Sequence, residues 1–489
     1  MDGILRLTLQ DSPLIMPEVM LAFFGMAILL TDFFLEPRQK AWNALTALLG
    51  VMFSGVSLFM LLPIASTARQ GFAGAIVIDS FFIFFSLIVL VATALVTLLS
   101  VHYLEVEHEH HGEYYALMLF AGVGMMFLAC GDDLVTLFVA LETMALSFYV
   151  LTGFLRRDRR SNEGAMKYIL LGAFSSGILA YGFSLLYGIA GSTKLEVIAA
   201  ALQRRSAADP MVIIAVVTVA AGVFFKVAAV PFHQWAPDVY EGAPTSISAF
   251  VSVASKTASF ALLLRLFLVV FWPVRVDWTP LLAAVAVLSM TLGNLAAITQ
   301  NNIKRLLAYS SISHVGYILL GLVAGNTRGL QAMAFYLLVY AFFNTGAFAI
   351  VIVLRRKGLI GDELEDLNGL AQRSPGAAIL MLIFLMSLAG IPPTAGFIGK
   401  LLIFWALIET GHYTLALIAV LYILPAVYYY FRMAAAMWSR EPSDAVRPII
   451  TFGQGAALTV MALITLVAGI YPEPFLRIAS YSLLAPFQR

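Results

Sequence analysis

The chain has 489 residues, of which 61% are hydrophobic and only 12% are charged, and its formal net charge is +1. Soluble domains carry about twice this share of charged residues. Apolar segments long enough to cross a bilayer recur along almost the whole sequence. The composition therefore excludes a soluble globular enzyme, gives no indication of nucleic-acid binding, and predicts an all-α polytopic membrane protein.

Two further observations limit the function classes. The first apolar run, after Pro13, contains Glu18 and lacks a small-residue cleavage site, so we expect a membrane span there and not a cleavable signal peptide. Cys130 is the one cysteine, which excludes an internal disulfide and a cysteine-ligated cluster held by this chain alone. The sequence has no CxxCH, GxGxxG or P-loop motif. We therefore expect no cofactor in this chain and an energy supply from an ion gradient or a partner.

In chain order, the apolar segments predict about fourteen membrane-spanning helices. The seventh is interrupted near Pro231 and the twelfth at Pro392-Pro393, because proline removes a backbone donor. A polar segment at 192–209 is expected to hold a short surface helix, and 361–367 is expected to be a helix within a charged loop. The predicted spans are 14–35, 41–62, 77–101, 114–130, 134–154, 164–190, 211–232, 244–271, 279–299, 303–324, 329–354, 376–409, 413–438 and 449–471.

The distribution of basic residues between loops predicts the orientation in the membrane. About fourteen arginines and lysines fall on the side that holds the first inter-span turn, against about nine on the other side. Because cytoplasmic loops carry the excess of basic residues, both termini are predicted outside.

A weak internal repeat divides the chain. The segment AMKYILLGAFSSG (165–177) resembles AMAFYLLVYAFFNTG (332–346), and AVP (229–231) resembles GIP (390–392). The offset of five spans inverts the second copy, and inverted repeats with broken helices are typical of transporters. We expect an N-terminal three-helix segment, two inverted five-helix repeats (spans 4–8 and 9–13), and a C-terminal helix and tail, with boundaries at 1–113, 114–271, 272–438 and 439–489.

Among the ionisable residues inside predicted spans, the main functional candidates are Glu142, Lys226, Lys256 and Lys400. A charged residue at the centre of a spanning helix costs about 2.5–3.5 kcal/mol on insertion scales, so such residues are functional candidates by default. Helix pairing by Glu142 and snorkelling by Lys226 are the structural alternatives. A series of such groups, reached by water at the helix breaks, would form a proton relay.

Three further residues are candidates for the same relay. His233 follows Pro231 and His314 lies ten residues into the tenth span, and the ordinary histidine pKa near 6.5 suits proton transfer. For His314, a hydrogen-bonded interior histidine is the equally weighted alternative. Lys304 begins the tenth span, where a positive-inside interface residue is the alternative to a relay role.

Other polar features favour structural readings. The run EVEHEHHGE (105–113) fits no clean metal site, so we expect a solvated loop and no metal. Glu18 and Asp32 flank the first span and are expected to be interfacial. Asp132 and Asp133 open the fifth span, where carboxylates favour the positive end of a helix. Tyr428-Tyr429-Tyr430 is expected to serve packing or the aromatic belt.

Three segments carry a resemblance to a known family. They are FKVAAVPFHQWAPDVYEGAPTSISAFVSVASK (225–256), NNIKRLLAYSSISHVGY (301–317) and LAGIPPTAGFIGK (388–400). They resemble the core motifs of the proton-translocating, antiporter-like membrane subunits, which include three large subunits of respiratory complex I and subunits of multi-subunit sodium/proton antiporters. The resemblance covers roughly spans four to thirteen.

The resemblance implies a central charged axis formed by Glu142, Lys226, Lys256 and Lys400. In this reading Lys226 is the switchable proton carrier, and Glu142 sets its pKa. Lys256 relays protons across the centre, and Lys400 passes them onward between two half-channels. The sequence shows no departure from the family pattern at these four positions.

The resemblance also implies the setting of the chain. We expect a proton-translocating subunit of an NADH–quinone oxidoreductase in the bacterial cytoplasmic membrane, assembled with other membrane-arm subunits, including other antiporter-like ones. FMN, iron–sulfur clusters, NADH and quinone would then be held by partner subunits. The alternatives are a subunit of a sodium/proton antiporter and a structural membrane-arm subunit that conducts no protons.

Overall fold

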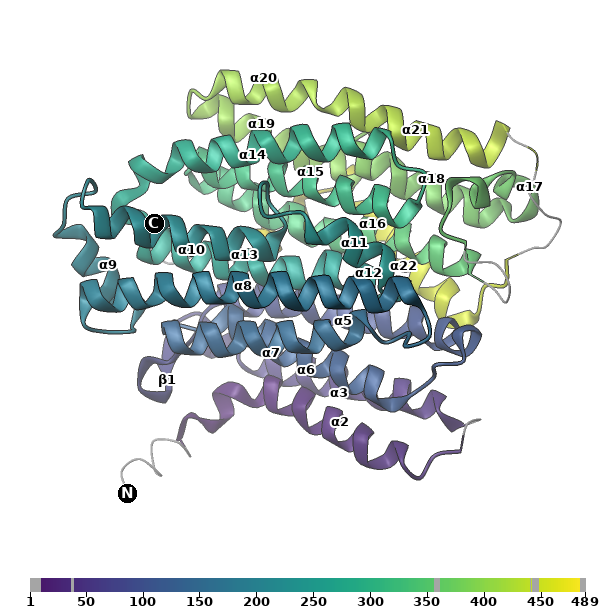
Figure 1. Ribbon diagram of the computed structural model, residues 1–489, viewed down its shortest axis with the longest axis horizontal. Helices are drawn as coiled ribbons and strands as arrows, with labels where there is room; N and C mark the ends of the chain where they lie inside the picture. The colour runs from purple at the N-terminus through teal and green to yellow at the C-terminus, as the bar shows by residue number, and fades with distance from the viewer. Residues whose placement is uncertain (1–9, 37–38, 356–360, 440, 442–447, 484–489) are drawn as a thin grey trace.

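The computed structural model describes residues 10–36, 39–355, 361–439, 441 and 448–483. Long helices lie roughly side by side and form one elongated bundle (Figure 1). The helices are α2 Met16–Asp32, α3 Ala41–Met60, α4 Leu62–Ala65, α5 Ser80–Glu107, α6 Gly112–Cys130, α7 Leu134–Thr152, α8 Arg159–Ala190, α9 Leu195–Gln203, α10 Pro210–Val227, α11 Trp235–Gly242, α12 Thr245–Phe250, α13 Lys256–Arg265, α14 Arg275–Ile298, α15 Ile303–Ala324, α16 Thr327–Leu354, α17 Leu370–Arg373, α18 Pro375–Ala389, α19 Ala395–Glu409, α20 Tyr413–Leu421, α21 Ile423–Ser439, α22 Phe452–Ile470 and α23 Glu473–Ser480.

The predicted membrane spans are confirmed. Within the described residues, 13 helical segments are long and apolar enough to cross a membrane. The remaining predicted span is the pair α18 and α19, two apolar helices of 15 residues each. Counted with that pair, the spans agree with the expected total, and the chain is a multi-span membrane protein. The expected surface helix is α9, and the expected loop helix is the 3₁₀ turn Leu364–Leu367.

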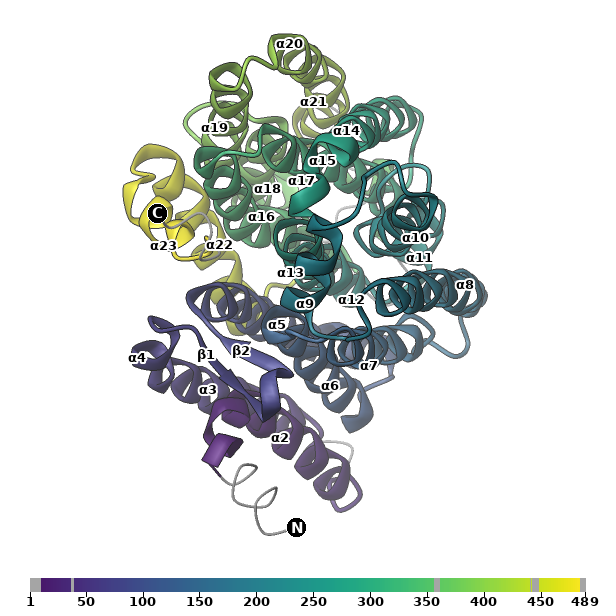
Figure 2. The ribbon, with the colours of Figure 1, turned by 90° about the vertical axis from the view of Figure 1, so that its left-hand side faces the viewer.

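The most completely buried spans lie at the centre of the bundle. Viewed along the helices, α2 and α3 lie at one edge of the bundle and α20 and α21 at the opposite edge, with α13 and α16 between them (Figure 2). The spans most enclosed by other helices are α12–α13, α15 and α16, in which almost every residue is buried. The outer helices α2, α3, α8 and α20 instead expose apolar side chains, as expected for surfaces that meet lipid or other apolar helices.

The two broken spans have the same local geometry. Helix α10 ends at Ala228 and α18 at Gly390, and both residues are left-handed, with φ of 60° and 83°. In each case the next amide closes the helix end, from Ala229 to Phe224 O (2.8 Å) and from Ile391 to Met386 O (2.9 Å). This is the hydrogen-bond pattern of a Schellman motif. The turn that follows contains a cis proline bond, Val230-Pro231 or Pro392-Pro393. Pro231 therefore corresponds to Pro393, one residue beyond the pairing expected from AVP and GIP.

The eighth span is an uneven helix. Two π-helical segments, Val251–Ser255 and Leu266–Val270, interrupt it between α12 and the turn at Phe271. The first ends directly before Lys256 and the second begins directly after Arg265. Such π segments widen a helix locally and are frequent at functional sites.

A small hairpin covers one end of the bundle. The strands β1 Arg69–Gly71 and β2 Ile76–Ile78 pair antiparallel between the second and third predicted spans, where no strand was predicted. Isolated bridges join Ile76 to Gly131 and Asp133 to Lys194 at this end. The opposite end holds the loops of the predicted cytoplasmic side, where Asn302 bridges to Glu363.

Candidate functional site

Glu142 and Lys226 occupy the first half of the bundle without touching each other directly. Glu142 is partly buried on α7 and accepts a 2.5 Å hydrogen bond from Ser176 Oγ on α8. Lys226 lies in the last turn of α10 and is 3% exposed. Its Nζ atom has no hydrogen-bond partner among the described residues, so Glu142, which the resemblance implies sets its pKa, does not bind it directly. Their interaction is electrostatic and acts at longer range.

The break in the seventh span carries His233. Its side chain is 9% exposed, and its Nδ1 atom has no partner among the described residues. Trp235 Nε1 donates to Phe225 O (2.8 Å), and Val230 N donates to Ser289 Oγ (3.0 Å). These two bonds satisfy backbone groups that the broken helix leaves free. The break is thus braced by an indole on one side and a hydroxyl on the other, next to Lys226.

Lys256 sits at the centre of the molecule, where α13 begins after a π segment. It is 3% exposed, and Nζ donates a 2.5 Å hydrogen bond to Ser311 Oγ on α15. The same Ser311 oxygen accepts from Tyr340 Oη on α16 (2.8 Å). Three central helices therefore meet at one serine hydroxyl. Hydrogen bonds to a buried charged group are worth more than bonds between neutral groups.

His314 lies one turn after Ser311 on α15, is buried, and contacts two tyrosine hydroxyl groups. Nδ1 is 2.8 Å from Tyr336 Oη, and Nε2 is 3.3 Å from Tyr430 Oη. Tyr430 in turn shares a short hydrogen bond with Ser310. His314 is thus hydrogen-bonded in the interior, and its relay role stays a prediction. The same contacts place a titratable ring between two tyrosine hydroxyl groups, an arrangement that suits proton transfer.

Lys400 belongs to the second half of the bundle and reaches back across the break in the twelfth span. Its Nζ atom donates to Leu388 O (3.1 Å) and Ala389 O (2.8 Å) at the end of α18. The last carbonyls of a helix lack intrahelical donors and carry a partial negative charge. The broken helix thus supplies the ammonium group with acceptors where no carboxylate is bound. Tyr317 lies under the same group, with its ring centre 4.9 Å from Nζ.

Lys304 is buried and binds backbone carbonyls, whereas an interfacial lysine would extend into solvent. It is 5% exposed, and Nζ donates to Glu241 O (2.6 Å) and Ala243 O (2.7 Å). Both carbonyls lie at the end of α11, so Lys304 caps the short helix that follows the break in the seventh span.

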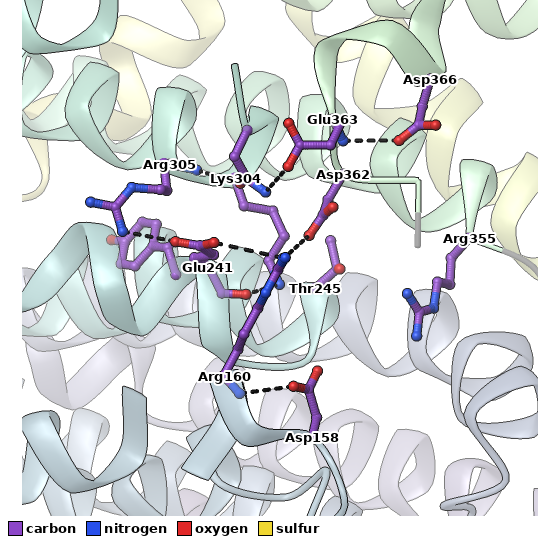
Figure 3. A network of polar contacts seen from close by, with 12 residues as sticks. Asp158, Arg160, Glu241, Thr245, Lys304, Arg305, Arg355, Asp362, Glu363 and Asp366 are labelled. Atoms are coloured by element: carbon purple, nitrogen blue, oxygen red, sulfur yellow. Dashed lines mark hydrogen bonds and ion pairs between the residues drawn. The ribbon is translucent and has the colours of Figure 1, made fainter. Parts of the chain in front are cut away.

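A network of ion pairs surrounds this cap at the loop end of the bundle (Figure 3). Asp238 on α11 pairs with Lys167 (2.6 Å) and Arg305 (2.7 Å), and Glu241 pairs with Arg305 (2.8 Å). Arg160 approaches Glu241 at 3.7 Å. Burial alone would raise the pKa of Asp238, but the hydrogen bonds from Lys167 and Arg305 outweigh it and hold the pKa below its ordinary value. The network ties α11 to α8 and α15.

Several of these partners were not predicted from the sequence. Lys256 and His314 were predicted as site residues, but the hydroxyls that contact them, from Ser311, Tyr336 and Tyr430, were not. One signal was available, because the run SSISHVGY places serines beside His314 in an otherwise apolar span. Tyr428-Tyr429-Tyr430 was interpreted as packing, and for Tyr430 that reading is incomplete.

Other buried charges lie away from the relay candidates. Arg265 donates to both oxygens of Asp79 (2.8 and 2.9 Å) and to Ala129 O, and it is 3% exposed.

Glu18 was expected at the interface, but it is 1% exposed, with Cys130 Sγ at 4.0 Å from Oε1. The interfacial expectation was wrong for Glu18 because α6 covers this part of α2 (Figure 2). Asp32 is partly exposed and pairs with Lys40 at 2.8 Å.

The histidine run forms no metal site in the part of the chain that the structure describes. No group of three or more His, Cys, Asp or Glu side chains there could hold a metal ion. His111 lies 3.2 Å from Glu109, and His110 lies 3.1 Å from Tyr115 Oη.

Comparisons with known proteins agree on one family. Residues 131–424 match the family described as NADH:quinone oxidoreductase/Mrp antiporter, TM. The chain is 57% identical over 476 residues to NADH-quinone oxidoreductase subunit N 2 of Solibacter usitatus, covering 96% of this chain and 97% of that protein. It is 53% identical to NADH-quinone oxidoreductase subunit N 1 of Koribacter versatilis, with 98% and 96% covered. Among solved structures, a chain of respiratory complex I from Thermus thermophilus matches with a TM-score of 0.81 and 32% identity, covering 95% of this chain and all of that one.

Proposed function

Because this chain belongs to the family of NADH:quinone oxidoreductase and Mrp antiporter membrane subunits, we propose that it translocates protons as a subunit of an NADH–quinone oxidoreductase complex. The high identity to subunit N proteins over nearly the whole chain favours this complex over a sodium/proton antiporter. In this proposal the enzyme activity belongs to the complex, and electron transfer takes place in partner subunits that hold FMN, iron–sulfur clusters, NADH and quinone.

One observation carries the proposal. Lysines with almost no exposed surface lie inside an apolar bundle, where Lys256 is hydrogen-bonded to a serine hydroxyl and Lys400 to helix-end carbonyls. Burying a cation without such partners would cost several kcal/mol. A purely structural role would be met by apolar side chains of similar volume at less cost. Proton translocation therefore accounts for the buried lysines better than a purely structural role does.

The relay begins at the break in the seventh span. A proton enters beside His233 and is taken up by Lys226, whose charge Glu142 stabilises from α7. Lys256 receives the proton at the centre. A lysine without a directly bound carboxylate can exchange its proton when nearby charge changes, because its charged form has no fixed counter-ion.

The second half of the relay passes through His314 to Lys400. Nδ1 and Nε2 of His314 contact two different tyrosines, so the ring can accept a proton on one side and release it on the other. Lys400 sits at the end of α18, where helix-end carbonyls stabilise its charged form. Lys304 holds the end of α11 and keeps the entry break in place.

The same proposal includes the membrane location, the orientation, the partner subunits and the division of the chain. The chain lies in the bacterial cytoplasmic membrane with its basic loops inside and both termini outside. Other membrane-arm subunits, including further antiporter-like ones, lie beside it. The chain divides into an N-terminal three-helix segment (1–113), two inverted repeats (114–271 and 272–438), and a C-terminal helix and tail (439–489).

Purification through a tag on this chain tests the assignment. We expect the tagged chain to bring down a complex that oxidises NADH, reduces quinone, and acidifies the interior of liposomes in which it is reconstituted inside-out. Sodium-dependent proton transport by a complex without flavin or iron–sulfur protein would instead assign the chain to an antiporter. A complex that pumps normally after all the candidate lysines are replaced would assign it a structural role.

A further inference from the structure

Each of the three buried lysines of the proposed relay lies over the ring of a tyrosine. Lys226 Nζ is 5.8 Å from the ring centre of Tyr149, Lys256 Nζ is 5.9 Å from that of Tyr240, and Lys400 Nζ is 4.9 Å from that of Tyr317. These distances fall within the range of about 6 Å over which a cation is attracted to an aromatic face. The pattern thus recurs three times in one chain.

Local spacing along a helix does not produce this pattern. The lysines lie on α10, α13 and α19, whereas their tyrosines lie on α7, α11 and α15. Each pair is therefore a tertiary contact between two different helices. All six side chains are 5% exposed or less.

In each pair, an aromatic ring contacts the ammonium group, where a carboxylate would be the usual partner of a buried lysine. Within the described part of the chain, the three ammonium groups contact a hydroxyl, two carbonyls or no hydrogen-bond partner, and none forms an ion pair with a carboxylate. A directly paired carboxylate would hold a lysine proton tightly. An aromatic face stabilises the cation more weakly than a paired carboxylate does. A ring therefore suits a site where the proton must also leave.

The first two tyrosines belong to one stack of rings. Tyr149 meets Tyr168 edge to face, with ring centres 4.8 Å apart, and Tyr168 stacks on Trp235 at 4.6 Å with an interplanar angle of 6°. Trp235 meets Tyr240 at 6.3 Å. The stack begins at the ring beside Lys226 and ends at the ring beside Lys256. It runs through α11, the short helix that Lys304 caps.

We propose that Tyr149, Tyr240 and Tyr317 are positioning residues of the relay, which hold the ammonium groups of Lys226, Lys256 and Lys400 over aromatic faces in place of carboxylates. This inference rests on the proposed proton translocation and adds to it the residues that keep each lysine charged but exchangeable. The aromatic ring of each tyrosine, and not its hydroxyl group, provides the contact with the ammonium group. Tyr149 Oη and Tyr240 Oη have no hydrogen-bond partner among the described residues, so their hydroxyls are not required for it.

The test compares the loss of the ring with the loss of the hydroxyl. Tyr149→Leu and Tyr240→Leu remove the ring, and Tyr149→Phe and Tyr240→Phe keep it. The readout is the number of protons pumped per NADH oxidised by equal amounts of assembled complex in liposomes. We expect the leucine variants to fall several-fold and the phenylalanine variants to match the unmodified complex. Tyr115→Leu is the matched control, because Tyr115 is equally buried but faces His110 and no lysine.

A second pair of variants tests Tyr149 through substitutions on the neighbouring helix α8. This pair is used if a leucine variant fails to assemble. A Cβ added at Gly172 on α8 would lie 2.0 Å from Tyr149 Oη and 2.7 Å from its Cζ, so Gly172→Ala must displace the ring. Gly177 on the same helix has no atom within 4 Å of that position. We expect Gly172→Ala to lower the pumping ratio and Gly177→Ala to leave it unchanged.

The outcomes separate this inference from the proposed function. Normal pumping by the leucine variants and by Gly172→Ala, or an equal loss in the phenylalanine variants, would overturn the role of the rings. If the relay itself were wrong, Lys226→Ala and Lys256→Ala in the same complex would also pump normally.

Discussion

Lys256 and Ser311 join two central helices through a single hydrogen bond of 2.5 Å between Nζ and Oγ. Ser311 is the one hydrogen-bond acceptor that the described residues provide for this ammonium group. Tyr340 donates to the same oxygen, so the serine couples α13, α15 and α16.

Replacing this serine should weaken the relay. Ser311→Ala removes a hydrogen bond to a charged group, which is worth about 1.5–3 kcal/mol, and leaves Tyr340 Oη without its acceptor. We expect proton pumping per NADH to fall by roughly tenfold while the complex still assembles, and Ser311→Thr to restore most of it. Ser259→Ala on α13 is the control, because that hydroxyl bonds only to Ser255 O in its own helix. Unchanged pumping in Ser311→Ala would remove the serine from the path.

The pair Arg265–Asp79 is expected to stabilise the fold without taking part in pumping. Breaking a buried ion pair by removing one partner costs about 3–5 kcal/mol, because a buried charge is left unpaired. Asp79 also caps α5 by accepting from Phe82 N (2.8 Å), and asparagine can keep that cap. Asp79→Asn should therefore sharply lower the amount of assembled complex in the membrane. Asp209→Asn changes an exposed cap with a surface pair to Arg205 and should have little effect.

Asp238 should stabilise the short helix α11 in a pH-dependent manner. Its pKa in the folded chain is below the ordinary value of 3.8, so its ion pairs contribute stability above that value and are lost as pH falls through the lower folded pKa. At neutral pH the contribution is fully present, and Asp238→Asn should remove it. Because the side chain is 30% exposed, we expect a loss of only about 1 kcal/mol. Thermal unfolding of the detergent-solubilised complex measures it, and Glu163→Gln, which removes an exposed partner of Lys167, is the control. Equal unfolding temperatures for Asp238→Asn and the unmodified complex at neutral pH would contradict this role.

Asp132, in the loop between α6 and α7, should destabilise the folded chain at neutral pH, whereas Asp238 stabilises it. Burial raises its pKa from 3.8 to about 6, so the folded chain binds the proton more tightly than the unfolded chain does. Stability therefore falls as pH rises from about 4 to about 6, and the penalty persists at neutral pH. Asp132→Asn keeps an acceptor for Gln70 Nε2 (3.0 Å) and removes the charge. We expect a higher unfolding temperature at pH 7 and a flatter profile between pH 4 and 6. A lower unfolding temperature at pH 7 would contradict the sign.

Much of the fold could be predicted from hydropathy and proline alone. The limits of the tenth span agree to the residue, because apolar runs are bounded by polar caps such as Asn302 and by Gly325. The seventh span breaks three residues before Pro231, at Ala228, since the left-handed residue that ends α10 is an alanine and carries no sequence signal. The hairpin Arg69–Ile78 was missed because its strands have only three residues each.

The partners of the site were harder to predict than its charged members. A lysine in an apolar span is conspicuous on its own, and Lys256 and Lys400 were named for that reason. Their partners come from distant parts of the chain, such as Ser311, which is 55 residues from Lys256. Arg265 and Asp79 are 186 residues apart, and no local pattern links them. Aromatic residues are so common in this chain that Tyr149 could not be distinguished from packing by sequence.

The most direct test of the proposed relay is the number of protons pumped per NADH oxidised by the reconstituted complex that carries Lys256→Ala. Lys256 is central and has one side-chain hydrogen-bond partner among the described residues, so its loss should interrupt the path with little effect on packing. We expect the complex to assemble and to pump far fewer protons per NADH, with slower coupled quinone reduction. An unchanged pumping ratio in a fully assembled complex would contradict the relay.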